Sequence, residues 1–122
     1  MARQWPPGAH FTAGLTGAVI RPYFFEILLR APGHELPKGE VVEQLRRLLA
    51  GQMGEQDRRF TSAGIEAWRH RLLGDVAILR RRGILAPESA EFRQMWRLTA
   101  AGVQEARGAA RHDRSSRRKH DR

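Results

Sequence analysis

Apolar side chains recur at steps of three and four residues between positions 65 and 79, which is the spacing of one helix face. At about 100° per residue they fall within a sector of roughly 80°, the width of a core-facing stripe. The positions that share this stripe are Ile65, Trp68, Leu72, Val76 and Leu79. Gly83 follows directly after three arginines, and it suits the left-handed residue that commonly ends a helix. The pattern predicts a long amphipathic helix that ends at residue 82.

Two earlier stretches have the same helical period. The first runs from about Val19 to Arg30, and Pro22 is compatible with it only near the first turn. The second begins near Pro37, has Glu40 in its first turn and ends around Gly51. Residues 51–63 are a polar connection with room for one helical turn. In that connection we expect Phe60 to anchor in the core and Thr61 or Ser62 to cap the long helix.

After Gly83 the period changes from that of a helix to that of a strand. Ile84 and Leu85 form a short apolar piece, residues 86–91 form a polar loop, and residues 92–98 alternate between apolar and polar. Thr99 is a good N-cap for a closing helix over residues 100–106. The order helix, strand, loop, strand, helix predicts a mainly α fold with a small β-hairpin wing, a winged helix-turn-helix. The expected organisation is an irregular arm over 1–17, a winged-helix domain over 18–106 and a disordered basic tail over 107–122, which could begin as the frayed end of the closing helix.

The charge balance points to an acidic partner. The chain has 22 Lys and Arg against 13 Asp and Glu, a formal net charge of +9. Residues 107–122 hold seven Lys or Arg and two Asp, so much of this excess lies in the tail. Arginine dominates over lysine, which suits contacts with phosphates and guanine edges, although a GC-rich genome produces the same bias.

The side of the long helix opposite its apolar stripe combines small residues with cations. Such a surface suits a nucleic-acid groove, and a solvated helix face has the same composition. We expect the third helix to enter the major groove of double-stranded DNA, with contacts also from the second helix, the wing and the tail. The candidate DNA-binding residues are Lys38, Arg58, Arg59, Arg69, His70, Arg71, Arg93, Arg97, Arg117, Arg118 and Lys119.

Several motifs carry a family resemblance over roughly residues 18–106. The segments RPYFFEILLR, LPKGEVVEQLRRLL, LRRRGIL and WRLTAAG occur in this order, and the chain resembles the N-terminal winged-helix domain of Mrr-type restriction proteins. It is also similar to winged-helix regulators of the PadR and MarR type. Where the Mrr-type helix often has a Trp at its middle, this chain has Gly74, and its Trp68 lies earlier. The resemblance implies DNA binding, either in a restriction or defence system or in transcription regulation.

Other sequence features restrict the function further. The chain has no cysteine, no stretch of 18 apolar residues and no apolar leader, so we expect a cytoplasmic protein that does not enter membranes. No Gly-rich phosphate loop, metal-type His pair or nuclease motif is present, so neither catalysis nor a cofactor is expected.

Two alternatives to DNA binding remain at this level. The chain is either a protein-interaction accessory subunit, with a nuclease or another protein as partner, or an RNA-associated basic protein that acts through its tail. A homodimer is compatible with each of these interpretations.

Overall fold

The structure, a computed structural model of the 122-residue chain, describes residues 14–89 and 94–120, and from residue 111 onward it describes the helix backbone only. In chain order its regular elements are α2 (Gly17–Arg30), β1 (Glu35–Pro37), α3 (Lys38–Leu49), α4 (Glu55–Arg58), α5 (Ala67–Arg81), β2 (Met95–Arg97) and α6 (Ala100–His120). Single turns of 3-10 helix cover Pro32–His34 and Ala50–Gln52. The expected mainly helical fold with a small antiparallel sheet is confirmed.

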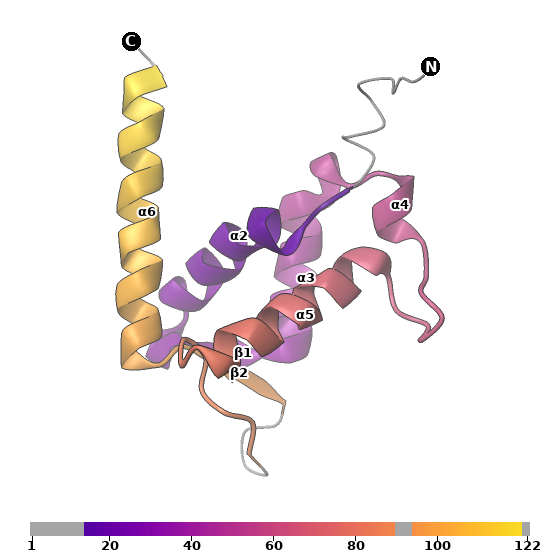
Figure 1. Ribbon diagram of the computed structural model, residues 1–122, viewed down its shortest axis with the longest axis horizontal. Coiled ribbons are helices and arrows are strands. Elements are labelled where there is room, and N and C mark those ends of the chain that lie inside the picture. Colours follow the sequence, from indigo (N-terminus) through magenta and orange to yellow (C-terminus); the bar gives the residue numbers. More distant parts are fainter. Residues whose placement is uncertain (1–13, 90–93, 121–122) are drawn as a thin grey trace.

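Helix α2 lies at the centre of the fold, because it contacts α3, α5 and the first part of α6 (Figure 1). Its buried residues meet the apolar stripes of α3 and α5, and the ring of Phe24 lies edge-on to Trp96 at 5.4 Å. The stripe predicted for α5 is confirmed at Trp68, Leu72, Val76 and Leu79, all of which are buried. The Arg21 guanidinium binds the buried Asp75 and ties α2 to α5.

The sheet differs from the predicted hairpin. Strand β2 pairs in antiparallel fashion with β1, which the sequence had suggested to be only the approach to the second helix. The register places Leu36 opposite Trp96. The expected partner of β2, the piece around Leu85, contributes one bridge to Leu98. Because Leu36 and Trp96 belong to segments far apart in the sequence, local periodicity could not reveal this pairing.

Helix boundaries also differ from the prediction in two places. Helix α2 begins at Gly17, capped by Thr16, so the expected irregular arm ends earlier and Leu15 already belongs to the core. Helix α6, expected to end near residue 106, continues to His120, through the segment that the sequence suggested to be a disordered tail or a frayed helix end. Alanine and arginine favour the helix, and no proline interrupts residues 100–120. The expectations for Trp5 and Phe11 lie outside the described residues.

Two of the predicted helix ends are confirmed, at Gly83 and Thr99, and the predicted N-cap of α5 is not. Gly83 has φ +76° after α5, as expected of a C-terminal glycine, and the Thr99 hydroxyl accepts a hydrogen bond from Gly102 N–H at 3.0 Å. The prediction that Thr61 or Ser62 caps α5 is wrong, because α5 begins only at Ala67 and its N-cap position is Glu66. Thr61 instead closes the preceding loop through its backbone N–H, which donates to Ile65 O at 2.8 Å.

Candidate nucleic-acid interface

The outer face of α5 is uncovered along its length. Its exposed positions, which we call the α5 face, are His70, Leu73, Gly74, Ala77, Ile78 and Arg81. The small residues expected on this side are therefore exposed, with the polar side chains of His70 at one end and Arg81 at the other. Leu73 and Ile78 add apolar surface, since 45% and 40% of these residues are exposed. A Cβ built on Gly74 would have no neighbour within 4 Å, so the middle of this face is open.

Arg71 does not belong to the α5 face, although the sequence placed it among the DNA contacts. Its Nη1 donates at 2.7 Å both to Asp57 Oδ1 and to the backbone oxygen of Leu15. Both acceptors lie inside the fold, so Arg71 ties α5 to the start of the described chain. The prediction that Arg71 stands outward is wrong, because a buried carboxylate holds its guanidinium.

Asp57 is the centre of this inner cluster and only 1% of its surface is exposed. Burial by itself would raise the pKa of this carboxyl group, but hydrogen bonds from Gly54 N–H, Leu15 N–H and Arg71 outweigh burial and lower its pKa. Asp57 is therefore an ionised carboxylate that joins α4, α5 and the segment before α2. Its role is to hold these elements together.

The remaining α5 candidates differ in exposure. His70 is exposed, whereas Arg69 lies at the edge of the buried side and is half-buried. Further along, Arg82 forms an ion pair with Glu105 of α6 at 2.9 Å. Of the three adjacent residues predicted as base or phosphate contacts, His70 is exposed, whereas Arg69 and Arg71 are half-buried and the Arg71 guanidinium is bound to Asp57.

Lys38 is engaged at the N-terminus of α3. Its Nζ lies 3.0 Å from Glu88 Oε2 and 6.0 Å from the centre of the Trp96 ring, and its backbone N–H donates to Gln94 O at 2.8 Å. Lys38, predicted to bind DNA, thus has an internal carboxylate close to its ammonium group, and its backbone N–H is already used. A phosphate at this position would have to displace Glu88.

Arg58, the last residue of α4, and Arg59, which follows it, are both exposed. Arg58 makes one long hydrogen bond, 3.4 Å from Nη2 to Ala50 O. Phe60, which directly follows them, is 68% exposed, so the prediction that it anchors the core is wrong. An apolar side chain in a polar connection was assumed to point inward, and the loop geometry turns it outward instead.

The candidates in the wing and the tail lie on β2, before β2 and on α6, not on α5. Arg97 is on the exposed side of β2, opposite Glu35 in the sheet register, and the residues before β2 that include Arg93 lie outside the described part. Arg117, Arg118 and Lys119 lie in the last turns of α6, which extends away from the other helices (Figure 1).

A cation on the inner side of α3 also has an internal partner. Arg46 Nη1 lies 2.8 and 2.9 Å from the two carboxylate oxygens of Glu66, and its guanidinium lies 5.7 Å from the centre of the Trp68 ring. The hydrogen bond with Glu66 raises the pKa of Arg46. Together with Arg21 and Arg71, this makes three arginines that stabilise contacts between elements, which lowers the charge available to an external partner.

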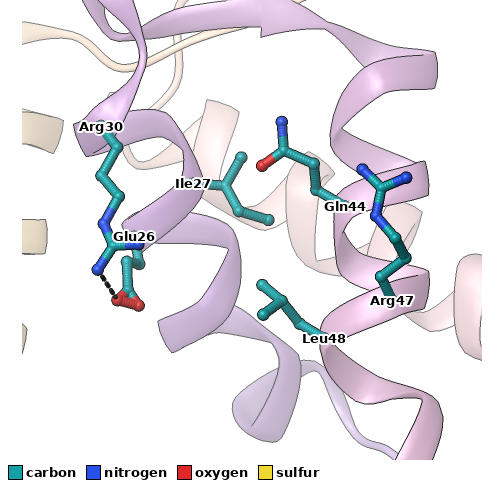
Figure 2. Close-up of a pocket in the computed structure, with 6 residues that line it drawn as sticks. All are labelled: Glu26, Ile27, Arg30, Gln44, Arg47 and Leu48. Carbon is teal, nitrogen blue, oxygen red and sulfur yellow. Dashed lines mark ion pairs between the residues drawn. The ribbon is translucent and has the colours of Figure 1, made fainter.

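A shallow hollow of about 250 Å³ lies between α2 and α3 (Figure 2). Ile27 and Leu48 point into it from the two helices, and the Glu26–Arg30 ion pair at 3.2 Å lies on its α2 side. Gln44 and Arg47 form the α3 side. It contains no nucleophile beside a base, and in the described part of the chain no three His, Cys, Asp or Glu residues gather as a metal site would require.

Comparisons of this chain with protein-family models, with characterised proteins and with solved structures find no match. Among the described helices, none combines the length and the apolar character that crossing a bilayer requires.

Proposed function

We propose that this chain is a winged-helix module that binds double-stranded DNA through the α5 face. One observation carries the proposal: α5 has an uncovered outer face and is followed by a loop that returns through β2 to pair with β1. The order α2, β1, α3, α5, β2, α6, with the short α4 inserted before α5, is compatible with a winged helix, in which the third main helix enters the major groove. The resemblance to Mrr-type restriction proteins and to PadR and MarR regulators favours a role in defence or in regulation.

The size and shape of the α5 face agree with groove binding. Gly74 and Ala77 leave room in the middle of the face, where a longer side chain can also be accommodated, and Arg81 and His70 offer donors at either end. Arg58 and Arg59 lie just before α5, where cations can contact the phosphates that flank a groove. Arg71 has no part in this interface, and Lys38 has at most a secondary one.

Gly74 provides the sharpest test, because a side chain added there meets open space. A lysine at this position should strengthen binding to a random duplex of about 20 base pairs, and a glutamate should weaken it about tenfold, since only the sign of the charge differs. The measurement is fluorescence anisotropy of the labelled duplex with Gly74→Lys, Gly74→Glu and Gly74→Ala. Gln44→Glu, which adds the same negative charge in the hollow between α2 and α3, is the matched control and should leave affinity nearly unchanged.

A second function is supported by Leu73 and Ile78, whose exposed apolar surfaces flank the small residues of the α5 face. Such a surface also suits the helix of a partner protein, as an accessory subunit would require. The Gly74 variants separate the two functions, because close helix contact is lost with lysine and glutamate alike, whereas DNA binding changes in opposite directions. Equal duplex affinity in both charged variants would contradict the DNA proposal.

A further inference from the structure

Phe60 is the most exposed of the large apolar side chains in the described part of the chain. It lies in the loop between α4 and α5, residues 59–66, which we call the Phe60 loop. An aromatic ring facing water forfeits the stabilisation that burial would provide. Its position outside the core therefore needs a cause in the loop itself or in what the loop binds.

Hydrogen bonds close the Phe60 loop both at its base and near its tip. At its base Ala67 N–H donates to Arg59 O at 2.8 Å, and Phe60 forms a β-bridge with Glu66. Nearer the tip Gly64 N–H donates to Thr61 O at 2.9 Å, with Gly64 at φ +81°, a conformation that favours glycine. The backbone around Phe60 is thus fixed, and the outward ring is a property of an ordered loop.

The base of the loop is also attached to the rest of the fold. Glu66, which bridges to Phe60, accepts two hydrogen bonds from Arg46 of α3. Arg46 lies over the buried ring of Trp68. Phe60 is therefore held at a defined position next to the first turn of α5.

The charged residues that neighbour Phe60 in the sequence indicate the chemistry of its binding partner. Arg58 and Arg59 precede it and are exposed, whereas the nearest carboxylates on either side, Asp57 and Glu66, are occupied by Arg71 and Arg46. Glu55 is the exposed carboxylate of α4. An exposed apolar ring that directly follows two exposed arginines in the chain matches a ligand with flat apolar faces between anionic groups, which is the chemistry of nucleic-acid bases between phosphates.

We infer that Phe60 is an apolar wedge that packs against or between bases of the bound duplex, while Arg58 and Arg59 contact the flanking phosphates. Architectural proteins use phenylalanine in this manner to unstack a base step. The inference rests on the proposed DNA binding and adds a second point of contact at the N-terminal end of α5. It also explains why the loop holds its ring away from the core.

The first experiment uses the salt dependence of duplex affinity to separate the contribution of the Phe60 ring from that of the Arg59 charge. Phe60→Ala should weaken duplex binding about tenfold and leave the slope of log K against log salt unchanged, because the ring displaces no counterions. Arg59→Gln should reduce the magnitude of that slope by about 0.9 for the lost phosphate contact. Because Phe60 is exposed, its alanine variant should retain the wild-type unfolding temperature, which checks that the fold is intact.

The second experiment detects the wedge directly. A duplex that carries 2-aminopurine at successive positions should gain fluorescence with the wild-type protein as one base step unstacks, and should gain none with Phe60→Ala. Phe60→Leu should retain part of the signal, since leucine is also an effective wedge.

The outcomes distinguish this inference from the proposed function. If Phe60→Ala binds duplex as tightly as the wild type while Gly74→Glu binds weakly, the wedge is wrong and the α5 face stands. If the wild type binds no duplex, both fail together. If Phe60→Ala instead dissociates a dimer seen by sedimentation and leaves duplex affinity unchanged, the ring serves contact between copies of the chain and the wedge is wrong.

Discussion

At the scale of single residues, two helical glycines of opposite character stand out. Gly102 in the first turn of α6 lies against the backbone of Ile84, so that an added Cβ would collide with the carbonyl of Ile84. Gly74 in α5 has open space in the same position. The first glycine is required by close packing, whereas the second leaves room on a surface.

These two glycines predict opposite changes in stability. Gly102→Ala should lower the free energy of unfolding by about 2–3 kcal/mol, because the backbone of Ile84 cannot move aside without disturbing the bridge at Leu85. Gly74→Ala should raise it by about 0.5–1 kcal/mol, since alanine favours the helix. Urea unfolding followed by circular dichroism measures both, and a stable Gly102→Ala variant would contradict the packing at this point.

At the scale of elements, the buried Asp57 joins parts of the chain that have few other contacts. The short helix α4, helix α5 and the segment before α2 all meet at this carboxylate. Removing its charge leaves the Arg71 guanidinium without its partner inside the fold, which is costly. We therefore expect Asp57→Asn to lower the free energy of unfolding by about 2–4 kcal/mol at neutral pH.

The pH dependence of this loss has a definite direction. Since the pKa of Asp57 is lower in the folded protein than its ordinary value of 3.8, its ionised form adds stability above that value. The contribution disappears as the pH falls from 3.8 through the lower pKa of the folded state. Urea unfolding of wild type and Asp57→Asn should therefore differ at pH 7 and converge in acid, and a constant difference would contradict the assignment.

The sequence predicted those elements whose signal is local. Spacing of apolar residues located α2, α3 and α5, and Gly83 and Thr99 marked a helix end and a helix start, because each depends on near neighbours. Strand β1 was not predicted, because its three residues, which include Pro37, are too few to show an alternating pattern. The strand forms only because it pairs with β2.

The candidate site was predicted less well, for a physical reason. Arg71 looked like an external cation, because its partners Asp57 and Leu15 are distant in sequence and only folding brings them together. Phe60 looked like a core residue because it is apolar. The run Arg58-Arg59-Phe60-Thr61-Ser62 is an available signal for the opposite, since no other large apolar residue lies within it.

At the scale of the whole molecule, the excess charge is unevenly distributed. Internal ion pairs occupy Arg21, Arg46 and Arg71, whereas the C-terminal part of α6 is rich in arginine. Attraction to phosphates from that part should be independent of sequence and sensitive to salt. The α5 face would then determine where the protein binds, and α6 would add to how strongly it binds.

This division predicts the effect of removing charge from α6. Arg117→Gln with Arg118→Gln should lower the magnitude of the salt slope of duplex binding by about 1.8, corresponding to two phosphate contacts. The matched variant Arg30→Gln with Arg47→Gln removes the same charge from the hollow between α2 and α3 and should change the slope little. Anisotropy titrations over a range of salt measure both, and equal slopes in the two variants would show that only net charge matters.

The pairing of β1 with β2 also has a consequence for biosynthesis. Glu35 meets Arg97 in this sheet, and α2 near the start of the chain contacts α6 near its end. Contacts between such distant segments form slowly, since a long loop must close before they are gained. On the ribosome, Phe24 cannot meet Trp96 until the segment that contains β2 has emerged. A nascent chain that ends before β2 should therefore keep apolar surface of α2 exposed, so that chaperones have access to this surface until β2 has left the ribosome.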